Sequence, residues 1–390
     1  MTRIQRTVAL GEVVELVMGQ APPSKDCNFD GNGTPFVKVG EFGLDRPVIR
    51  EWTTNPLRMA RKSDVLLCVV GATCGKINLG EDCAIGRSVA AIRPSIAKLD
   101  QYYLYYFMMT LVERLRTGSV GAAQTVISKD MISSVELPFL PLPEQRRVVT
   151  ILDEAFDDIA TAKVNAERNL QNARALFESY LQSVFTNSQE GWREVKRPLA
   201  ELCELIIDCE HKTAPTQEHG IPSIRTPNIG KGELLLDGVY RVSEETFRSW
   251  TRRAEPRPGD LILAREAPAG NVAVIPENLK VCLGQRTVLI RPMRDVFEPY
   301  FLALTLLAPR IQKKLLAHSR GATVQHVNMK DIRALNVGAI PVLKVQRSIE
   351  ATATRISKAA EQLQSIYQRK LAALDELKKS LLDQAFSGQL

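Results

Sequence analysis

Residues 143–187 read PEQRRVVTILDEAFDDIATAKVNAERNLQNARALFESYLQSVFTN, and this stretch decides how the chain is organised. Apolar side chains recur in it at steps of three and four residues, at Leu152, Ala155, Ile159, Ala162, Ala166, Leu170, Ala173, Phe177, Leu181 and Val184. That spacing places them on one face of an α-helix. Pro143 stands where a helix start tolerates proline, and neither proline nor glycine follows before residue 187. The pattern predicts one helix of about forty residues, ~60 Å long.

The C-terminal segment repeats this pattern. Its apolar positions are Ile349, Ala353, Ile356, Ala360, Leu363, Tyr367, Leu371, Leu374, Leu377 and Leu381, with no proline or glycine between Pro341 and Gly388. A helix of this length would overrun a globule of about 150 residues. We therefore expect the two helices to pair as an antiparallel coiled coil, which would set two globular heads at its ends as a ruler between two sites. The alternative is that each helix packs only on its own globular domain.

The regions that precede the two helices also match each other. In chain order, the matches include Leu10, Glu12 and Leu16 with Leu199, Glu201 and Leu205; Asp64 with Asp260; Gly86, Arg93 and Pro94 with Gly284, Arg291 and Pro292; and Gln145 and Arg146 with Gln346 and Arg347. Such ordered self-similarity indicates a tandem duplication. The predicted fold class is α+β, with two similar mixed α/β domains joined by two long antiparallel helices in a pseudo-twofold arrangement.

Four segments follow from this interpretation. Residues 1–145 form a first globular domain, here called head 1, and residues 146–187 form the central helix. Residues 188–344 form a second globular domain, head 2, and residues 345–390 form the C-terminal helix. Within the heads, 65–70 and 261–264 are expected to be strands, and 102–112 and 297–307 to be helices.

Composition and cysteine usage exclude several classes of protein. Hydrophobic residues are 45% and charged residues 24%, the balance of a folded globular chain. The longest uncharged apolar run, near residues 65–72, is far below the ~20 residues that span a bilayer. The start of the chain lacks the apolar core of a signal peptide, so we expect an intracellular, cytoplasmic protein without a membrane partner. Seven cysteines without a C-x-x-C spacing predict buried thiols, and the four histidines form no metal motif.

Motifs for catalysis are missing from the sequence. The segment Gly71-Ala-Thr-Cys-Gly75-Lys76 has three residues between its glycines where a P-loop needs four, and Ile77 stands where a P-loop has Ser or Thr. It is better interpreted as a hairpin turn with a basic tip. No G-x-G-x-x-G follows a strand, and neither an Asn/Asp-Pro-Pro-Tyr/Phe nor a G-x-S-x-G segment occurs. We expect this chain to perform no chemistry and to bind no cofactor or metal of its own.

The charge distribution permits a nucleic-acid partner without demonstrating one. The net charge is +7, and residues 188–344 hold 23 Lys/Arg against 18 Asp/Glu. Arginine suits guanine, asparagine and glutamine suit adenine, and lysine and hydroxyl groups suit phosphates. The candidate DNA-binding residues are Lys25, Lys38, Lys76, Arg87, Ser88, Gln124 and Thr125 in head 1, and His211, Lys212, Thr213, Arg225, Asn228, Arg265, Gln285, Arg286, Gln325 and His326 in head 2.

Arg286 is the sharpest of these candidates. It follows the strand-like segment Val281-Cys-Leu-Gly284, whose glycine allows a tight turn, and the matched position in head 1 is Ser88. Different polar groups at one place in the two heads are what base readout requires. We hypothesise a bidentate contact from Arg286 to a guanine in the major groove. A phosphate contact and an internal ion pair are the alternatives.

Two stretches carry a family resemblance. Residues 137–149, LPFLPLPEQRRVV, and the C-terminal residues 378–390, KKSLLDQAFSGQL, with an internal echo SYLQSVF at 179–185, resemble the helix junctions of specificity (S) subunits of type I restriction–modification enzymes. The segment DCEHKTAP at 208–215 is similar to the opening of their recognition domains. The resemblance covers essentially the whole chain, including its duplication.

The resemblance implies function and partners. Each recognition domain would read one half of a bipartite, asymmetric site in double-stranded DNA. The two helical regions would bind two modification (M) subunits, which hold S-adenosylmethionine and methylate adenine, and restriction (R) subunits would use ATP and magnesium. Gln145, Arg146, Gln346 and Arg347 at the helix junctions would contact the M subunits, although the second junction has fewer prolines and lacks the glutamate. A self-contained DNA methyltransferase and a coiled-coil scaffold that binds no DNA remain the alternatives.

Overall fold

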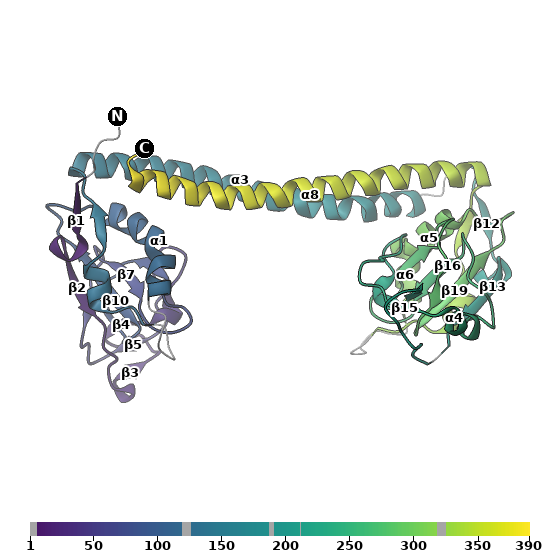
Figure 1. Cartoon of the computed structure of the whole chain (residues 1–390), viewed down its shortest axis with the longest axis horizontal. Coiled ribbons are helices and arrows are strands. Elements are labelled where there is room, and N and C mark those ends of the chain that lie inside the picture. Colours follow the sequence, from purple (N-terminus) through teal and green to yellow (C-terminus); the bar gives the residue numbers. More distant parts are fainter. Residues whose placement is uncertain (1–5, 119–125, 187–190, 211, 318–324) are drawn as a thin grey trace. The chain divides into compact units, whose positions relative to one another are not determined.

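The computed structural model describes residues 6–118, 126–186, 191–210, 212–317 and 325–390 (Figure 1). Two helices of 45 residues each dominate it, α3 (Leu142–Thr186) and α8 (Leu343–Ser387). The chain divides into two compact units. Unit 1 comprises Met1–Glu167 with Arg369–Leu390, and unit 2 comprises Arg168–Gln368. Each unit therefore holds one head together with part of both long helices.

Head 1 contains a four-stranded antiparallel sheet that packs against a helix. Its strand order is β2 (Val14–Met18), β10 (Val89–Pro94), β7 (Val65–Cys68) and β8 (Ile77–Leu79), with α1 (Gln101–Gly118) alongside β7 and β8. A second sheet has the order β3 (Cys27–Asn28), β5 (Trp52–Thr53), β4 (Thr34–Val37), β9 (Cys83–Ile85) and β6 (Met59–Ala60). The ends of the head are joined by β1 (Thr7–Ala9) with β11 (Glu136–Pro138), and α2 (Lys129–Ser133) precedes β11.

Head 2 repeats this arrangement. Its four-stranded sheet has the order β13 (Cys203–Asp208), β19 (Thr287–Pro292), β16 (Leu261–Ala264) and β17 (Val272–Val274). Its second sheet has the order β15 (Arg241–Val242), β14 (Ile221–Ile224) and β18 (Cys282–Leu283), and β12 (Arg193–Val195) pairs with β20 (Gly338–Ile340). The helices are α4 (Glu244–Trp250), α5 (Pro299–Leu307), α6 (Pro309–Leu315) and α7 (Met329–Ala334). The predicted duplication and α+β class are confirmed.

One of the sequence matches between the heads is displaced by a residue. In head 1, Ile92 of β10 lies opposite Leu16, whereas in head 2 the matched Ile290 of β19 lies opposite Ile206. The cause is a register shift in β13 between Cys203 and Leu205. An extra residue in one strand displaces every later residue by one position relative to its partner. Leu16 therefore corresponds to Ile206, and its match with Leu205 is wrong.

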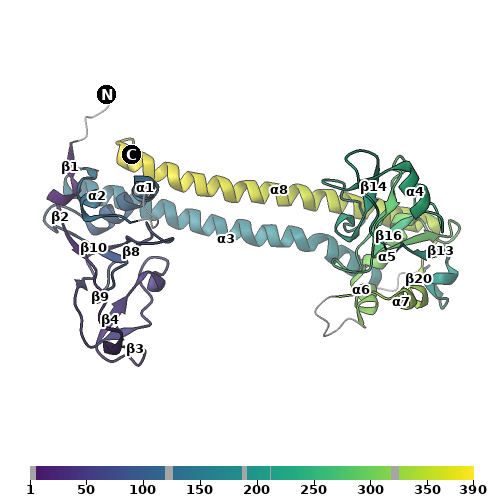
Figure 2. The ribbon, with the colours of Figure 1, turned by 60° about the horizontal axis from the view of Figure 1, so that its bottom comes forward.

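The long helices run antiparallel to each other within each unit (Figure 2). In unit 1 the beginning of α3 meets the end of α8, because Arg147 Nη2 donates to the carbonyl of Leu390 at 3.4 Å and Lys163 forms an ion pair with Asp375. In unit 2 the end of α3 meets the beginning of α8, where the Tyr180 hydroxyl donates to the carbonyl of Ile349 at 3.2 Å. The predicted antiparallel pairing is confirmed.

Each head also packs against the C-terminal end of a long helix, α8 in unit 1 and α3 in unit 2. In unit 1, the ring of Phe386 from α8 lies 5.0 Å from that of Tyr103 and 5.3 Å from that of Phe107, both on α1. In unit 2, the ring of Phe185 from α3 lies 5.8 Å from that of Phe301 on α5. The alternative, that each helix packs only on its own domain, is wrong, because the core of head 1 includes the C-terminal end of α8.

The buried helix stripe is narrower than the sequence indicates. Positions near the heads are buried, including Leu152, Leu181 and Ala353. Leu363 and Leu377 keep 37% and 46% of their surface exposed. Both lie on α8 between the buried positions Ala360 and Leu382. The helices also begin at Leu142 and Leu343, a few residues before the predicted starts.

A buried arginine–aspartate pair occurs in both heads. Arg93 Nε and Nη2 each lie 3.0 Å from an oxygen of Asp64, and the carboxylate also accepts the backbone N–H of Arg61. In head 2, Arg291 Nε and Nη2 lie 2.8 and 2.7 Å from Asp260, which accepts the N–H of Arg257. The bidentate geometry satisfies both charges where the chain turns into β7 and β16.

The predictions about cysteines can be compared with the structure directly. All seven cysteines are free thiols, and all except Cys27 are buried. Burial raises the pKa of Cys83, Cys203 and Cys282 to about 12, which keeps these thiols protonated and unreactive. In the described ranges, no helix is long and apolar enough to cross a membrane.

Candidate nucleic-acid interface

In head 1, the strands β3, β4 and β5 of the second sheet lie on the side of the central sheet away from the long helices (Figure 1). The turns that end β4 and β14 carry Lys38 and Arg225, two candidate DNA-binding residues at matched positions. The remaining candidates come mainly from turns at the ends of the central sheet.

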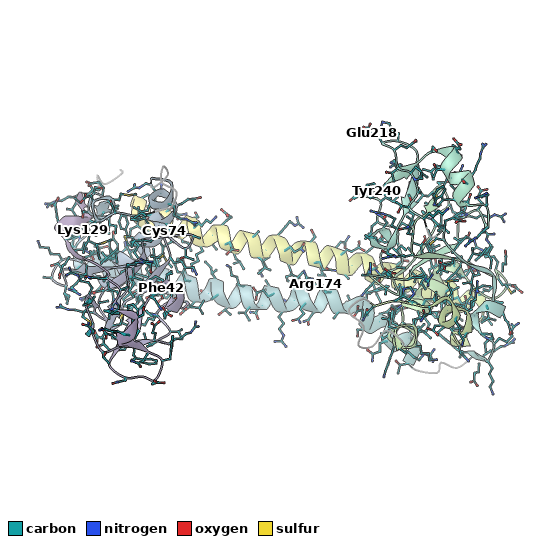
Figure 3. All side chains as sticks on the ribbon, turned by 90° about the horizontal axis from the view of Figure 1, so that it is seen from below. Phe42, Cys74, Lys129, Arg174, Glu218 and Tyr240 are labelled. Carbon is teal, nitrogen blue, oxygen red and sulfur yellow. The ribbon has the colours of Figure 1, made fainter. Side chains whose placement is uncertain are left out.

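Arg225 stacks on an aromatic ring in head 2. Its guanidinium carbon lies 4.2 Å from the ring centroid of Tyr240, which is 49% exposed. Figure 3 labels Tyr240 among the side chains of head 2. The stem of Arg225 passes over Gly284, where a Cβ would come within 2.5 Å of the Arg225 Cγ. Glycine is therefore required at this turn for a steric reason. Arginine on an aromatic face combines positive charge with a flat surface, a common device at nucleic-acid sites.

Head 1 holds a less accessible counterpart at Lys38. Its Nζ lies 5.5 Å from the ring centroid of Phe36 and forms an ion pair with the nearly buried Glu51. The stem again crosses the matched glycine, because a Cβ on Gly86 would lie 3.1 Å from the Lys38 Cγ. Lys38 therefore has an internal partner with which DNA must compete.

Five charged or titratable side chains form a chain of contacts in head 2. Arg265 is 13% exposed and lies 2.5 Å from Asp208 through Nη1, and its Nη2 lies 3.0 Å from His326 Nε2. His326 Nδ1 lies 3.5 Å from Glu266 Oε1, and the other oxygen of Glu266 pairs with Arg286. The side chain of Arg286 is 62% exposed, so this network, hereafter the 208–286 network, ends at the surface.

Arg286 also has an uncommon backbone conformation. Its φ is +64°, the only positive φ of a non-glycine residue in the described parts of the chain. The left-handed region costs an L-amino acid free energy, so such residues are found where the surrounding structure imposes them, often at functional sites. The carbonyl of Arg286 accepts the N–H of Arg265 at 2.9 Å, which ties this turn to the end of β16.

Two of the predicted DNA contacts, Asn228 and Arg265, have internal partners. Asn228 is 9% exposed, accepts the N–H of Arg225 through its side-chain oxygen, and donates to the carbonyl of Leu235. The guanidinium of Arg265 is hydrogen-bonded to Asp208 and His326, and its Nε donates to the carbonyl of Val327 at 3.0 Å. Both side chains hold neighbouring loops in place and have little surface for DNA.

The two glutamines expected to contact M subunits are also internal. Gln145 is 0% exposed; its Nε2 donates to the carbonyls of Lys98 and Leu140, and its Oε1 accepts the N–H of Asp100. Gln346 makes the same three bonds with Val296, Pro341 and Glu298. Neither side chain is exposed to a partner, because each glutamine joins its head to the start of its helix. Arg146 and Arg347 are exposed on the next position.

The other predicted residues have surface available or fall outside the description. Lys25, Lys76, Arg87, Lys212, Thr213 and Gln325 are exposed, and Ser88, Gln285 and His326 are partly exposed. Gln124, Thr125 and His211 lie outside the described residues. The structure brings Arg225 next to the Gly284 turn that carries Gln285 and Arg286. Sequence reasoning missed Tyr240 and Glu266. The available signals were an aromatic residue directly before Arg241 and an acidic residue directly after Arg265.

The polar side chains of head 2 are arranged in a way that suits the recognition of nucleic acid. In the described ranges, no cluster of His, Cys, Asp and Glu could hold a metal ion. The head 2 surface offers a stacked arginine, an exposed arginine and an acceptor carboxylate within one neighbourhood. These groups match the donors and acceptors of base edges in a major groove.

A family model and known proteins agree with this interpretation. The family model described as type I restriction modification DNA specificity domain matches residues 5–169 and again residues 190–368. The type I restriction enzyme EcoBI specificity subunit of Escherichia coli is 20% identical over 420 residues, covering 98% of this chain and 85% of that protein. A putative type I restriction enzyme MjaX specificity subunit of Methanocaldococcus jannaschii is 31% identical over 173 residues, covering 42% of this chain and 40% of that protein.

Solved structures show the same fold. The HsdS subunit of Thermoanaerobacter tengcongensis superimposes with a TM-score of 0.66 at 21% identity, covering 99% of this chain and 97% of that one. A chain from a structure on assembly and conformational transition of the type I R-M system gives a TM-score of 0.76 at 20% identity, covering 99% and 98%. Both family-model matches together span most of the sequence. The chain therefore belongs to the family of type I restriction–modification DNA specificity subunits and carries the specificity domain of that family twice.

Proposed function

We propose that the chain is the sequence-reading, non-catalytic subunit of a type I restriction–modification complex, with each head reading one half of a bipartite DNA site. The observation that carries this proposal is the contrast between the heads. Their four-stranded sheets and their Asp–Arg ion pairs coincide, whereas the turn after β9 carries Arg87 and Ser88 and the turn after β18 carries Gln285 and Arg286. A shared scaffold with different polar groups at one turn is what reading two different half-sites requires.

The partners follow from the same proposal. Two M subunits would dock on the helical regions and supply S-adenosylmethionine for adenine methylation, and R subunits would bring ATP and magnesium. The complex would act in the cytoplasm, where the DNA of the cell lies. Exposed Arg146 and Arg347, one turn from the helix starts, are the side chains that we propose for M-subunit contact. The chain itself would bind none of these cofactors.

A domain graft tests the two-headed reading. Residues 188–340 are replaced by the corresponding residues of a relative, and the chimera is assembled with its M subunits. Sequencing of methylated adenines in cellular DNA should show one half of the target changed and the other retained. The reciprocal graft of residues 6–140 is the matched control and should change the opposite half. If both halves change in either chimera, the heads do not read independently.

An insertion tests whether the helices set the spacer. Because α3 and α8 pair antiparallel within both units, one heptad is inserted into each, after Glu167 and after Gln368, so that their lengths stay equal. The methylated site should keep both half-sites and gain spacer length. Altered half-site bases with an unchanged spacer would refute this role. A purified chain that bound S-adenosylmethionine by itself would favour the methyltransferase alternative, and a complex without salt-sensitive DNA affinity would favour the scaffold.

A further inference from the structure

We propose that Glu266 is a specificity-determining residue of head 2, which pairs with Arg286 and restricts that guanidinium to guanine. This inference rests on the proposed function, because it concerns how head 2 reads DNA. Glu266 lies in the turn after β16, and one of its carboxylate oxygens forms the ion pair with Arg286 Nη1. The acid is 21% exposed while its partner is 62% exposed, so DNA reaches the arginine first.

The second carboxylate oxygen of Glu266 contacts His326, which helps to hold the side chain in place. Oε1 lies 3.5 Å from His326 Nδ1, and His326 Nε2 lies 3.0 Å from Arg265 Nη2. Arginine can only donate, so Nε2 of His326 accepts this bond, and a neutral His326 then carries its proton on Nδ1, facing Glu266. Arg265 is anchored in turn by Asp208. A carboxylate fixed in this way loses little conformational entropy when DNA arrives, which is the condition for precise readout.

The shared scaffold does not need the 208–286 network. Backbone hydrogen bonds set Val69 of head 1 at the place of Arg265, because the N–H of each bonds to the carbonyl of Ser88 or Arg286, respectively. The same pairing makes Val70 the counterpart of Glu266, and Val126 the counterpart of His326. Head 1 therefore forms the same sheet with valines where head 2 has an acid and a histidine. A purely structural role for Glu266 would have to exist in one head only.

The Glu266–Arg286 pair favours guanine over the phosphate, adenine and thymine groups that Arg286 could otherwise contact. A guanidinium has five N–H donors, so Arg286 can keep Glu266 on one edge while it donates to guanine O6 and N7 with the other. The neighbouring carboxylate can accept from a cytosine N4 amino group, which a G·C pair presents in the major groove. A phosphate in the same place would face the negative charge of Glu266. Adenine offers one acceptor beside a donor, and thymine one acceptor beside a methyl group, so neither replaces guanine.

The central experiment removes the charge and keeps the shape. The full chain carrying Glu266→Gln is assembled with its M subunits. Binding is measured to the duplex that methylation mapping identifies and to a duplex with that site scrambled, at two salt concentrations. We expect affinity for the scrambled duplex to rise about tenfold, and the cognate-to-scrambled ratio to fall by a similar factor. The salt slope on scrambled DNA should steepen by about 0.9, because Arg286 then binds a phosphate.

Two further variants make the result specific. Glu244→Gln is the matched control: it removes the same charge from head 2 at another ion pair, with Lys280 at 3.0 Å, outside the network. This variant should change the affinity for both duplexes by the same small factor and leave the cognate-to-scrambled ratio unchanged. The double variant Glu266→Gln with Arg286→Ala should lose the gain on scrambled DNA, because that gain acts through Arg286.

The outcomes separate this inference from the proposed function. The inference is wrong if Glu266→Gln behaves as Glu244→Gln does. It is also wrong if Glu266→Gln weakens binding to both duplexes equally and lowers the melting temperature of the protein, because Glu266 then has no role in specificity. If the wild-type complex binds both duplexes equally, head 2 does not read DNA, and the proposed function fails along with the inference. A reduced ratio that persists in the double variant would also overturn the inference, because the effect would not depend on Arg286.

Discussion

Head 1 and head 2 share one set of polar contacts and differ in another. Asp64 with Arg93 in head 1 corresponds to Asp260 with Arg291 in head 2, pair for pair and bond for bond. By contrast, the 208–286 network of head 2 has Met18, Val69, Val70, Ser88 and Val126 at the matched places of head 1. What occurs in both heads builds the domain, and what occurs in one is available for its ligand.

The largest effect is expected for the shared ion pair. Asp64→Ala should lower the free energy of unfolding of unit 1 by about 2–3 kcal/mol, because it removes both hydrogen bonds of Arg93, 13% exposed, to Asp64 and leaves the more exposed Glu15 as its charged partner. Asp260→Ala should do the same to unit 2. Hydrogen exchange measured peptide by peptide reports each unit separately. If either substitution weakened both units equally, the two heads would not be independent folding units.

The junction glutamines come next. Gln145→Leu and Gln346→Leu should each cost roughly 2–3 kcal/mol, since each removes three hydrogen bonds and leaves buried backbone groups unsatisfied. Faster exchange should appear at the start of α3 in the first variant and at the start of α8 in the second. Exposed Arg146→Ala and Arg347→Ala are the controls; they should leave exchange unchanged and weaken M-subunit binding instead. An unstable Arg146→Ala chain would contradict this division of roles.

The third effect concerns readout in one head. Arg286→Ala should cost ~1–3 kcal/mol on the cognate duplex and relax the preference at one base pair. Relief of the positive φ is not part of this loss, since alanine is also an L-residue. Ser88→Ala, at the matched turn of head 1, should have a smaller effect and only on the other half-site. Uniform weakening of Arg286→Ala on all duplexes would identify a phosphate contact.

The smallest effect depends on pH. Burial raises the pKa of Glu350 above its usual range, with Glu298 adding to the shift and Arg347 opposing it; the matched residue in head 1 is Val149. A raised carboxyl pKa in the folded state means that stability is lost as pH rises through that pKa. Glu350→Gln should therefore stabilise unit 2 slightly at neutral pH and have no effect below about pH 4. Thermal unfolding at the two pH values measures the difference, and a destabilised variant at neutral pH would refute it.

Periodicity and repetition were sufficient to predict the architecture. The 3.6-residue stripe of residues 152–184 predicted α3 to within a few residues, because a long uninterrupted helix leaves few alternatives. The register shift in β13 could not be predicted, since it alters which residues face each other without altering their composition. Buried partners were also invisible in the sequence. Gln145, Asn228 and Arg265 had the residue types of a recognition surface, and only their partners reveal internal roles.

The position of Phe386 against α1 has a consequence for synthesis. As the chain leaves the ribosome, head 1 emerges before head 2, yet its unit needs residues 369–390, which are translated after all of unit 2. Unit 2 is complete as soon as residue 368 has emerged. Unit 1 therefore begins before unit 2 and is completed after it, and the α1 surface around Tyr103 and Phe107 stays without Phe386 while all of unit 2 is translated.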